Sequence, residues 1–169
     1  MKYIVGTVDI YQRGLSELPK LQGVIVEGSF DCGKNKLSTL EGCPDQVRVD
    51  FDCSNNLLVS LKDGPKEVGG HYFCSNNNLT SLEGCPKVIL GIFSCDDNQL
   101  SDLKGSPKII RDSFDCSNNN LTSLEGCPKE VDGNFECYGN VTFFTEEDVR
   151  AVCKVGGRVT IGVKGQGRL

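Results

Sequence analysis

The sequence predicts a solenoid, in which equivalent turns of chain stack on one another and each turn contributes one short strand. Six cysteines recur at a fixed interval of 21 residues: Cys32, Cys53, Cys74, Cys95, Cys116 and Cys137. An aromatic residue stands two positions before each of these cysteines, and an asparagine stands three positions after it. One turn cannot bury its apolar side alone, so its neighbours must supply the rest of the core.

Residues 1–29 are expected to form an N-terminal capping turn, because the first turn of a solenoid would otherwise expose its core. Tyr3 to Ile10 supply the strand material of this cap. The cap also contains a degenerate first turn, offset by 22 residues from the regular ones. Its aromatic, cysteine and two leucine positions are taken by Val8, Ile10, Leu15 and Leu18.

Residues 30–142 carry the regular repeat, and each recurring residue in it has an expected structural role. In Phe-x-Cys, alternate residues of a short strand face the same way, so both named side chains face the interior. The asparagine leaves the strand and can hydrogen-bond backbone groups of the turn. Two leucines fill the opposite side of the core, and a proline then ends the strand pairing and sends the chain across the back.

Residues 143–169 are expected to form a small cap of one helix and one strand, followed by a tail. Thr145 and the acidic residues after it predict the start of a short helix over about 145–154. The helix should place Val149, Val152 and Cys153 on one face. Val159, Ile161 and Val163 alternate as a final strand, and Lys164 to Leu169 form the tail.

The chain has ten cysteines, which in a small secreted protein would indicate a disulfide framework. We interpret them instead as reduced thiols of the core, because they recur at inward-facing positions and the N-terminus shows no signal peptide. A metal site or a redox role is the weaker alternative, since no Cys-x-x-Cys pair occurs. We therefore expect no metal, no other cofactor and a cytoplasmic location.

The stretch Phe51-Asp-Cys53-Ser-Asn-Asn56-Leu-Leu58-Val-Ser-Leu61 resembles the leucine-rich repeat family. The proline after the last leucine is similar to the short repeats of bacterial effector proteins. The stretch from Phe114 to Lys129 is similar to leucine-rich repeat proteins of large tailed bacteriophages. The resemblance covers residues 7–142. It implies a right-handed arc with a concave parallel sheet of about seven short strands, a loop-rich convex side and protein binding on the concave sheet.

Residues beside the inward-facing pair should point outward across this sheet, and most of them are acidic. Like charges on neighbouring strands disfavour folding, so we expect the acids to serve something other than the fold. They either keep the sheet soluble or attract a basic partner. His71, Phe73 and Ile92 form an apolar centre, provided that Tyr72 rather than Phe73 turns inward. The predicted partner-binding residues are Asp31, Asp50, Asp52, His71, Phe73, Ile92, Ser94, Asp96, Asp115 and Glu136.

We expect a non-catalytic protein, since no nucleophile stands beside a base and His71 is the sole histidine. The lysines that follow each proline, in a chain of net charge −5, indicate a solvated surface rather than a nucleic-acid site. No apolar run is long enough to predict a membrane span. The expected partner is another protein, basic or with an exposed apolar anchor, bound by a monomer or a weak oligomer.

The resemblances suggest three roles for such a module. By analogy with the phage proteins, it binds and inhibits a host factor in the host cytoplasm. The alternative is a structural or virion-assembly protein whose solenoids pack end to end, which requires an exposed apolar end. A ubiquitin-ligase-type effector is the least expected, because it needs a large catalytic domain and only residues 143–169 follow the repeats.

Overall fold

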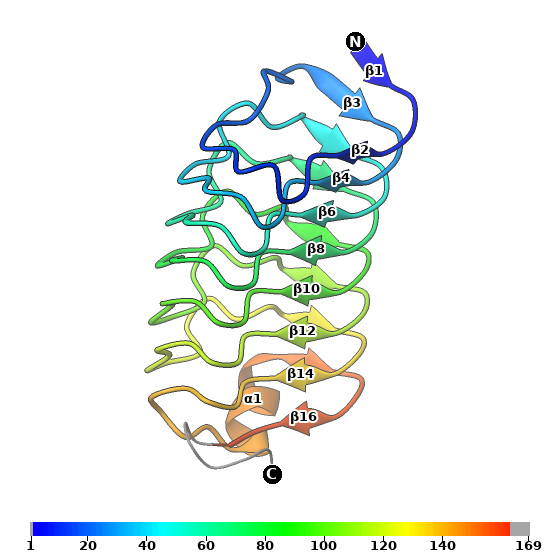
Figure 1. The fold of residues 1–169 in the computed structure, drawn as a ribbon. Coiled ribbons are helices and arrows are strands. Elements are labelled where there is room, and N and C mark those ends of the chain that lie inside the picture. The colour runs from blue at the N-terminus through cyan, green and yellow to red at the C-terminus, as the bar shows by residue number, and fades with distance from the viewer. Residues whose placement is uncertain (1, 163–169) are drawn as a thin grey trace.

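The computed structural model describes residues 2–162, which form a solenoid of parallel strands with a repeat of about 21 residues. Figure 1 shows the turns stacked one below another between the N-terminal strands and the C-terminal helix. The solenoid predicted from the cysteine spacing is confirmed. Val163 and the expected tail, Lys164 to Leu169, lie outside the described residues.

One side of the stack is an eight-stranded parallel sheet, which we call the front sheet. It has one strand more than the seven expected, because the last strand of the C-terminal cap joins it. Each strand is only two residues long, since the second residue after the cysteine takes a left-handed conformation, as at Asn55 (φ 58°) and Asn76 (φ 54°). The strands are β2 (Val8–Asp9), β4 (Phe30–Asp31), β6 (Phe51–Asp52), β8 (Tyr72–Phe73), β10 (Phe93–Ser94), β12 (Phe114–Asp115), β14 (Phe135–Glu136) and β16 (Val159–Thr160).

The opposite side, expected to be rich in loops, also carries strands. They form two separate four-stranded parallel sheets, which we call the upper and lower back sheets. The upper back sheet has β1 (Lys2–Ile4), β3 (Val24–Val26), β5 (Gln46–Val47) and β7 (Glu67–Val68), and the lower has β9 (Val88–Ile89), β11 (Ile109–Ile110), β13 (Glu130–Val131) and β15 (Lys154–Val155). In β5, β7, β9, β11 and β13, the strand contains the aliphatic residue three positions after the proline of its turn, and that residue is buried.

The core lies between the front and back sheets and is built from columns of equivalent side chains. The aromatic column contains Phe30, Phe51, Tyr72, Phe93, Phe114 and Phe135, all with no exposed surface. Successive ring centroids lie between 4.9 Å and 6.0 Å apart. Tyr72 faces inward and Phe73 outward, so the predicted register is confirmed.

The six periodic thiols are buried beside the aromatic column, as predicted. Four of them donate weakly to a backbone carbonyl of the next turn, as Cys53 Sγ does to Phe73 O at 3.4 Å. Burial raises the pKa of these thiols, for example that of Cys137 to about 12. They are therefore protonated at neutral pH and behave as small apolar side chains.

A buried asparagine joins each turn to the one before it. Asn119 has no exposed surface; its Nδ2 donates to Cys116 O (3.2 Å) and Ser117 O (3.1 Å) of its own turn and to Cys95 O (3.0 Å) of the preceding turn. Its Oδ1 accepts the Leu100 N–H at 3.0 Å. Equivalent bonds recur at Asn35, Asn56, Asn77, Asn98 and Asn140, so the amides form a continuous ladder through the stack.

The turn that contains Tyr72 departs from the others in two linked positions. Tyr72 is the one tyrosine in the aromatic column, and its hydroxyl is buried without a hydrogen-bond partner among the described residues. Gly64 occupies the position before proline, where the other repeats carry cysteine or serine. A Cβ atom at Gly64 would lie 3.4 Å from the Tyr72 hydroxyl and 3.0 Å from Leu40 Cδ1. The small residue therefore makes room for the larger ring.

The C-terminal cap begins with the predicted helix, α1 (Glu146–Val152). Thr145 and Asp148 form a capping box at its start, in which each side chain bonds the backbone N–H of the other. Val149 and Cys153 are buried, whereas Val152 is 50% exposed and does not share their face as expected. Among residues 2–162 there is no helix with the length and apolarity that crossing a membrane requires.

The asparagine ladder can be tested with two adjacent residues. Asn119→Ala should lower the free energy of unfolding by about 2–3 kcal/mol, because it leaves the buried Leu100 N–H without its partner and removes one bond from each of three carbonyls, which keep another donor. The control is Asn120→Ala, an exposed neighbour, which should change stability by about 0.5 kcal/mol or less. Urea unfolding followed by circular dichroism measures both, and equal effects of the two substitutions would contradict a structural role for the ladder.

The buried hydroxyl of Tyr72 predicts a stabilising substitution. Tyr72→Phe restores the aromatic residue of the other repeats and removes a polar group that has no partner among the described residues, so the free energy of unfolding should rise by about 1 kcal/mol. Phe93→Tyr, which introduces a hydroxyl where no glycine makes room, should instead destabilise. A loss of stability in Tyr72→Phe would show that a buried water satisfies the hydroxyl.

Candidate functional site

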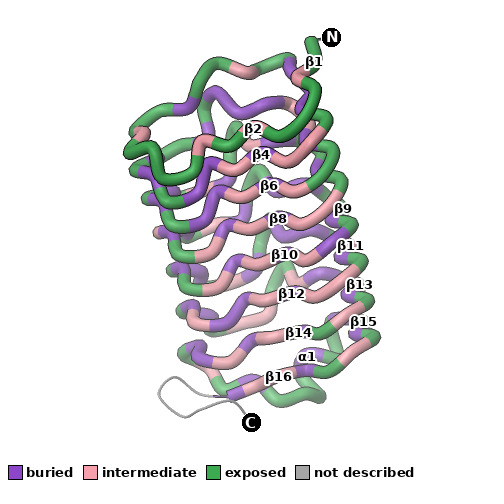
Figure 2. Tube along the Cα trace, turned by 45° about the vertical axis from the view of Figure 1, so that its right-hand side comes forward, coloured by how far each residue is buried: buried purple, intermediate pink, exposed green. Residues whose placement is uncertain are grey.

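The predicted partner-binding residues all lie on the outer face of the front sheet. Six of them form one row in direct register across neighbouring strands: Asp31, Asp52, Phe73, Ser94, Asp115 and Glu136. Asp50, His71 and Ile92 come from a second row just before the strands, and Asp96 lies just after β10. All ten are half-buried, because neighbouring side chains about 4.8 Å apart cover each other's flanks. Figure 2 shows this intermediate burial along the front strands.

Most acids of the main row also hold the fold, so the expectation that they serve only something other than the fold is wrong. Asp31 Oδ1 accepts the Gly33 N–H at 2.8 Å, and Asp52 Oδ1 accepts the Ser54 N–H at 2.8 Å. Asp115 Oδ1 accepts both the N–H (2.9 Å) and the hydroxyl (2.5 Å) of Ser117. Each carboxylate thus fixes the tight turn that ends its own strand. The pattern Asp-Cys-Ser or Asp-Cys-Gly was a signal for this role in the sequence.

The second row forms a chain of bonds from side chain to backbone along the stack. Asp50 Oδ1 accepts the His71 N–H at 2.8 Å, and His71 Nδ1 in turn accepts the Ile92 N–H at 2.9 Å. Because Nδ1 acts as the acceptor, the proton of the neutral imidazole is assigned to Nε2. The imidazole is therefore oriented by the backbone, with Nε2–H as its remaining donor.

The centre of the face differs from its two ends. The rings of His71 and Phe73 lie in contact, with centroids 5.5 Å apart. Beside them, the hydroxyls of Ser75 and Ser94 both bond Asp96 Oδ1, the latter at 2.5 Å, and lie 3.0 Å from each other. Sequence reasoning missed Ser75 in this cluster, because its bonds reach residues about 20 positions away.

The electrostatics of the acidic row change along the stack. Burial raises the pKa of Asp115 to about 6, while the bonds from Ser117 oppose that shift and the nearby carboxylates of Asp96 and Glu136 add to it. The pKa of Asp31 is also raised, first by burial and then by Asp52 and Asp9. Crowding of carboxylates therefore makes the outer face favour a cation beside it.

The polar side chains at the centre of this face bond one another. The hydroxyls of Ser75 and Ser94 both donate to the carboxylate of Asp96, so these three side chains are hydrogen-bonded to one another within the face. Across residues 2–162, no group of three or more histidine, cysteine or acidic side chains is placed to hold a metal ion. What the face presents is a row of carboxylates on both sides of a short apolar centre.

The raised pKa of Asp115 predicts a pH-dependent gain of stability in Asp115→Asn. A carboxyl with a folded-state pKa near 6 and an unfolded value near 4 favours folding below about pH 4, and this contribution is lost as the pH rises through 6. The asparagine amide carries no charge and its oxygen can still accept the Ser117 bonds, so the variant should be more stable than the parent at pH 7.5, by on the order of 2 kcal/mol. Urea unfolding between pH 4 and 7.5 measures the difference, which should vanish near pH 4.

Asp148→Asn provides a control for this pH series, because its effect on the free energy of unfolding should have the opposite sign. The Thr145 backbone N–H and hydroxyl lower the pKa of Asp148, so its charged form favours folding above its unfolded pKa. This variant should lose stability at neutral pH and not at strongly acidic pH. If Asp115→Asn behaved in the same way, the bonds from Ser117 would outweigh the cost of burying the Asp115 charge.

Comparison with known proteins identified no relative of this chain. No family model, no curated protein and no solved structure matches the chain. The leucine-rich repeat family therefore remains a resemblance carried by the repeat motif, while the stacked turns themselves define the fold. On that basis the chain is a solenoid of parallel strands with a repeat of about 21 residues.

Proposed function

We propose that this protein is a non-catalytic, leucine-rich-repeat-type binding module that recognises another protein on the outer face of its front sheet. The single observation that carries the proposal is Phe73. In the strands on its N-terminal side, the same position holds an aspartate that bonds the backbone two residues later, as at Asp31 and Asp52. Phe73 gives up this bond and places an aromatic ring on the outer face instead.

The exchange is unfavourable for the isolated chain. It removes a turn-fixing bond and adds nothing to the core, since the inward position of that strand belongs to Tyr72. Departures from a local rule without gain to the fold are typical of functional positions. Aromatic residues at the centre of a polar surface are also the usual anchors of protein interfaces.

The chemistry of the face indicates the kind of partner. Its ends present the carboxylates of Asp31, Asp50 and Asp52 on one side and Asp115 and Glu136 on the other. Lysine or arginine side chains of a partner would pair with these rims, while an apolar side chain packs against Phe73 and Ile92. Rim charges of this kind raise the association rate, and the central contact supplies most of the affinity.

The C-terminal cap bears on the alternative of end-to-end assembly, which needs an exposed apolar end. Phe144, Val149 and Cys153 of the cap are buried in the common core, while Phe143 and Val152 are exposed. An inhibitor of a host factor, as the resemblance to phage proteins implies, would need only the front face. We therefore place the host-factor role within this proposal and leave assembly as the alternative.

The proposal is tested by affinity capture. The protein is used as bait in an extract of the cells in which it naturally occurs, and the captured proteins are quantified. Phe73→Ala should reduce capture of a specific partner at least tenfold, because a buried aromatic anchor contributes about 2 kcal/mol or more. Asp52→Asn should weaken capture and its salt dependence, because it removes the charge but keeps an oxygen for the Ser54 N–H.

Matched substitutions elsewhere keep this result interpretable. Leu57→Ala removes an exposed apolar side chain (52% exposed), and Glu41→Gln neutralises an exposed acid. Both lie outside the outer face and should leave capture unchanged. Partners retained equally by Phe73→Ala and by the parent protein, with all variants folded by circular dichroism, would show that the face is not the binding site.

A further inference from the structure

The back of the solenoid is interrupted between β7 and β9. Everywhere else on this side, neighbouring strands share backbone bonds, such as Gly69 N–H to Val47 O and Arg111 N–H to Ile89 O, both 2.9 Å. By the same register, Leu90 N–H would donate to Val68 O, but that bond is absent from the described part of the chain. The upper back sheet therefore ends at β7 and the lower one begins at β9, which is labelled in Figure 2.

A groove of about 420 Å³ lies over this interruption and crosses β5, β7 and β9. Its apolar wall includes Val88 and Leu90, which are 41% and 57% exposed. Gly69 helps to keep it open, since it stands between Arg48 and Leu90 in the repeat and has no side chain. A Cβ atom at Gly69 would lie 2.1 Å from Arg48 O, so the backbones approach too closely for any other residue.

Three cations border the groove, and two of them form no ion pair among residues 2–162. Arg48, Lys66 and Lys87 line it, against one acid, Glu67. Lys66 reaches Asp45 at 3.5 Å and is mostly exposed, while Arg48 and Lys87 form no ion pair among the described residues.

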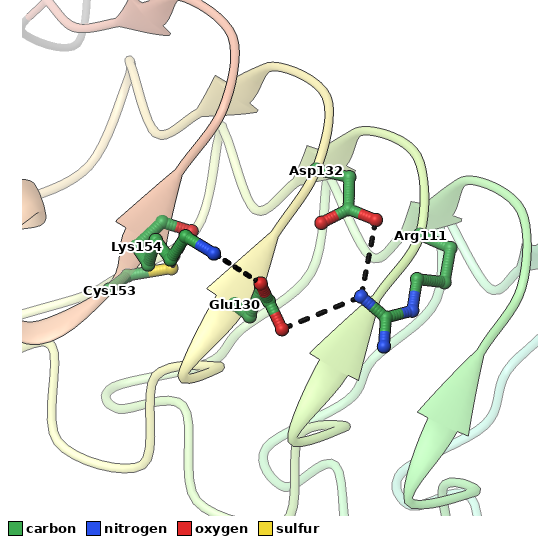
Figure 3. A network of polar contacts seen from close by, with 5 residues as sticks. All are labelled: Arg111, Glu130, Asp132, Cys153 and Lys154. Carbon is green, nitrogen blue, oxygen red and sulfur yellow. Dashed lines mark hydrogen bonds and ion pairs between the residues drawn. The ribbon is translucent and has the colours of Figure 1, made fainter.

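The lower back sheet shows what the same positions do when their charges are paired. There Arg111 bonds both Glu130 (3.4 Å) and Asp132 (3.3 Å), and Lys154 reaches Glu130 at 2.7 Å, as Figure 3 shows. Arg48 and Glu67 occupy the positions equivalent to Arg111 and Glu130, yet they form no such pair among residues 2–162. Among the described residues, Arg48 thus lacks the carboxylate partners that its equivalent Arg111 has.

We propose that this groove binds a small amphiphilic carboxylate, a site separate from the protein-binding face. The apolar body of the ligand lies along Val88 and Leu90, and its carboxylate is held by Lys87 and Arg48. The volume is within the range of small-molecule sites, which is about 300–1,000 Å³, and an alkyl chain of about ten carbons fills it. Arginine and lysine together are the usual partners of a carboxylate. The Leu90 N–H, which has no acceptor among residues 2–162, is a further donor at the same place.

Decanoate is the probe that tests the site, with binding followed by saturation-transfer NMR and by amide shifts of the protein. We expect a Kd on the order of 0.1–1 mM for a ligand of this size and shifts centred on Lys87 and Leu90. Lys87→Glu should weaken binding at least tenfold, and Leu90→Asp should abolish it. The control Lys129→Glu changes the equivalent lysine two turns away, outside the groove, and should bind as the parent does.

Three further results decide the proposal independently of the front face. Decanol, which has the same chain without the charge, should bind at least tenfold more weakly, and Phe73→Ala should bind decanoate normally. Equal binding of decanol would overturn the role of the cations, and an equal loss in Lys129→Glu would overturn the location. Absence of decanoate binding, or binding of an acidic peptide in its place, would overturn the ligand class.

Discussion

The buried asparagine of each turn bonds carbonyls of its own turn and of the turn before, and the remaining architecture depends on this contact. It satisfies backbone groups that a chain bending so sharply cannot pair within itself, and it does so only when neighbouring turns are in register. The bonds recur through the 21-residue turns, and at the first turn, which is one residue longer, Asn35 still donates to Ile10 O at 2.9 Å and accepts the Leu15 N–H at 3.0 Å. The aromatic and thiol columns then stack because the ladder has already aligned them.

The same alignment decides what the surface can do. Once the aromatic and cysteine positions are committed to the core, the residue between them must face outward in every turn. Aspartate at that position stabilises the turn through its hydrogen bond and also gives the outer face its negative charge. The same side chain therefore contributes to folding stability and to the proposed binding. At β8 the two are separated, because Phe73 replaces the carboxylate and Gly64 accommodates the unusual Tyr72 beneath it.

The sequence was informative wherever a residue type has one physical use in the repeat. Cysteine, phenylalanine, asparagine and leucine revealed the period and the inward face, and Thr145 marked the start of α1. The back strands could not be predicted, because two residues with a single buried aliphatic show no alternation. The bond from His71 to Ile92 and the ion pairs of Arg111 join residues about 20 positions apart, so they became visible only once the turns were stacked.

The interruption between β7 and β9 also bears on how the molecule comes apart. In a one-dimensional stack, stability is the sum of what each turn contributes and what each junction adds. The junction at β7 and β9 keeps the front sheet and the asparagine ladder but lacks the backbone bonds of the back, so it is the weakest link in the series. The solenoid is thus two cooperative blocks joined at a seam, and a ligand lying across that seam would make them unfold as one.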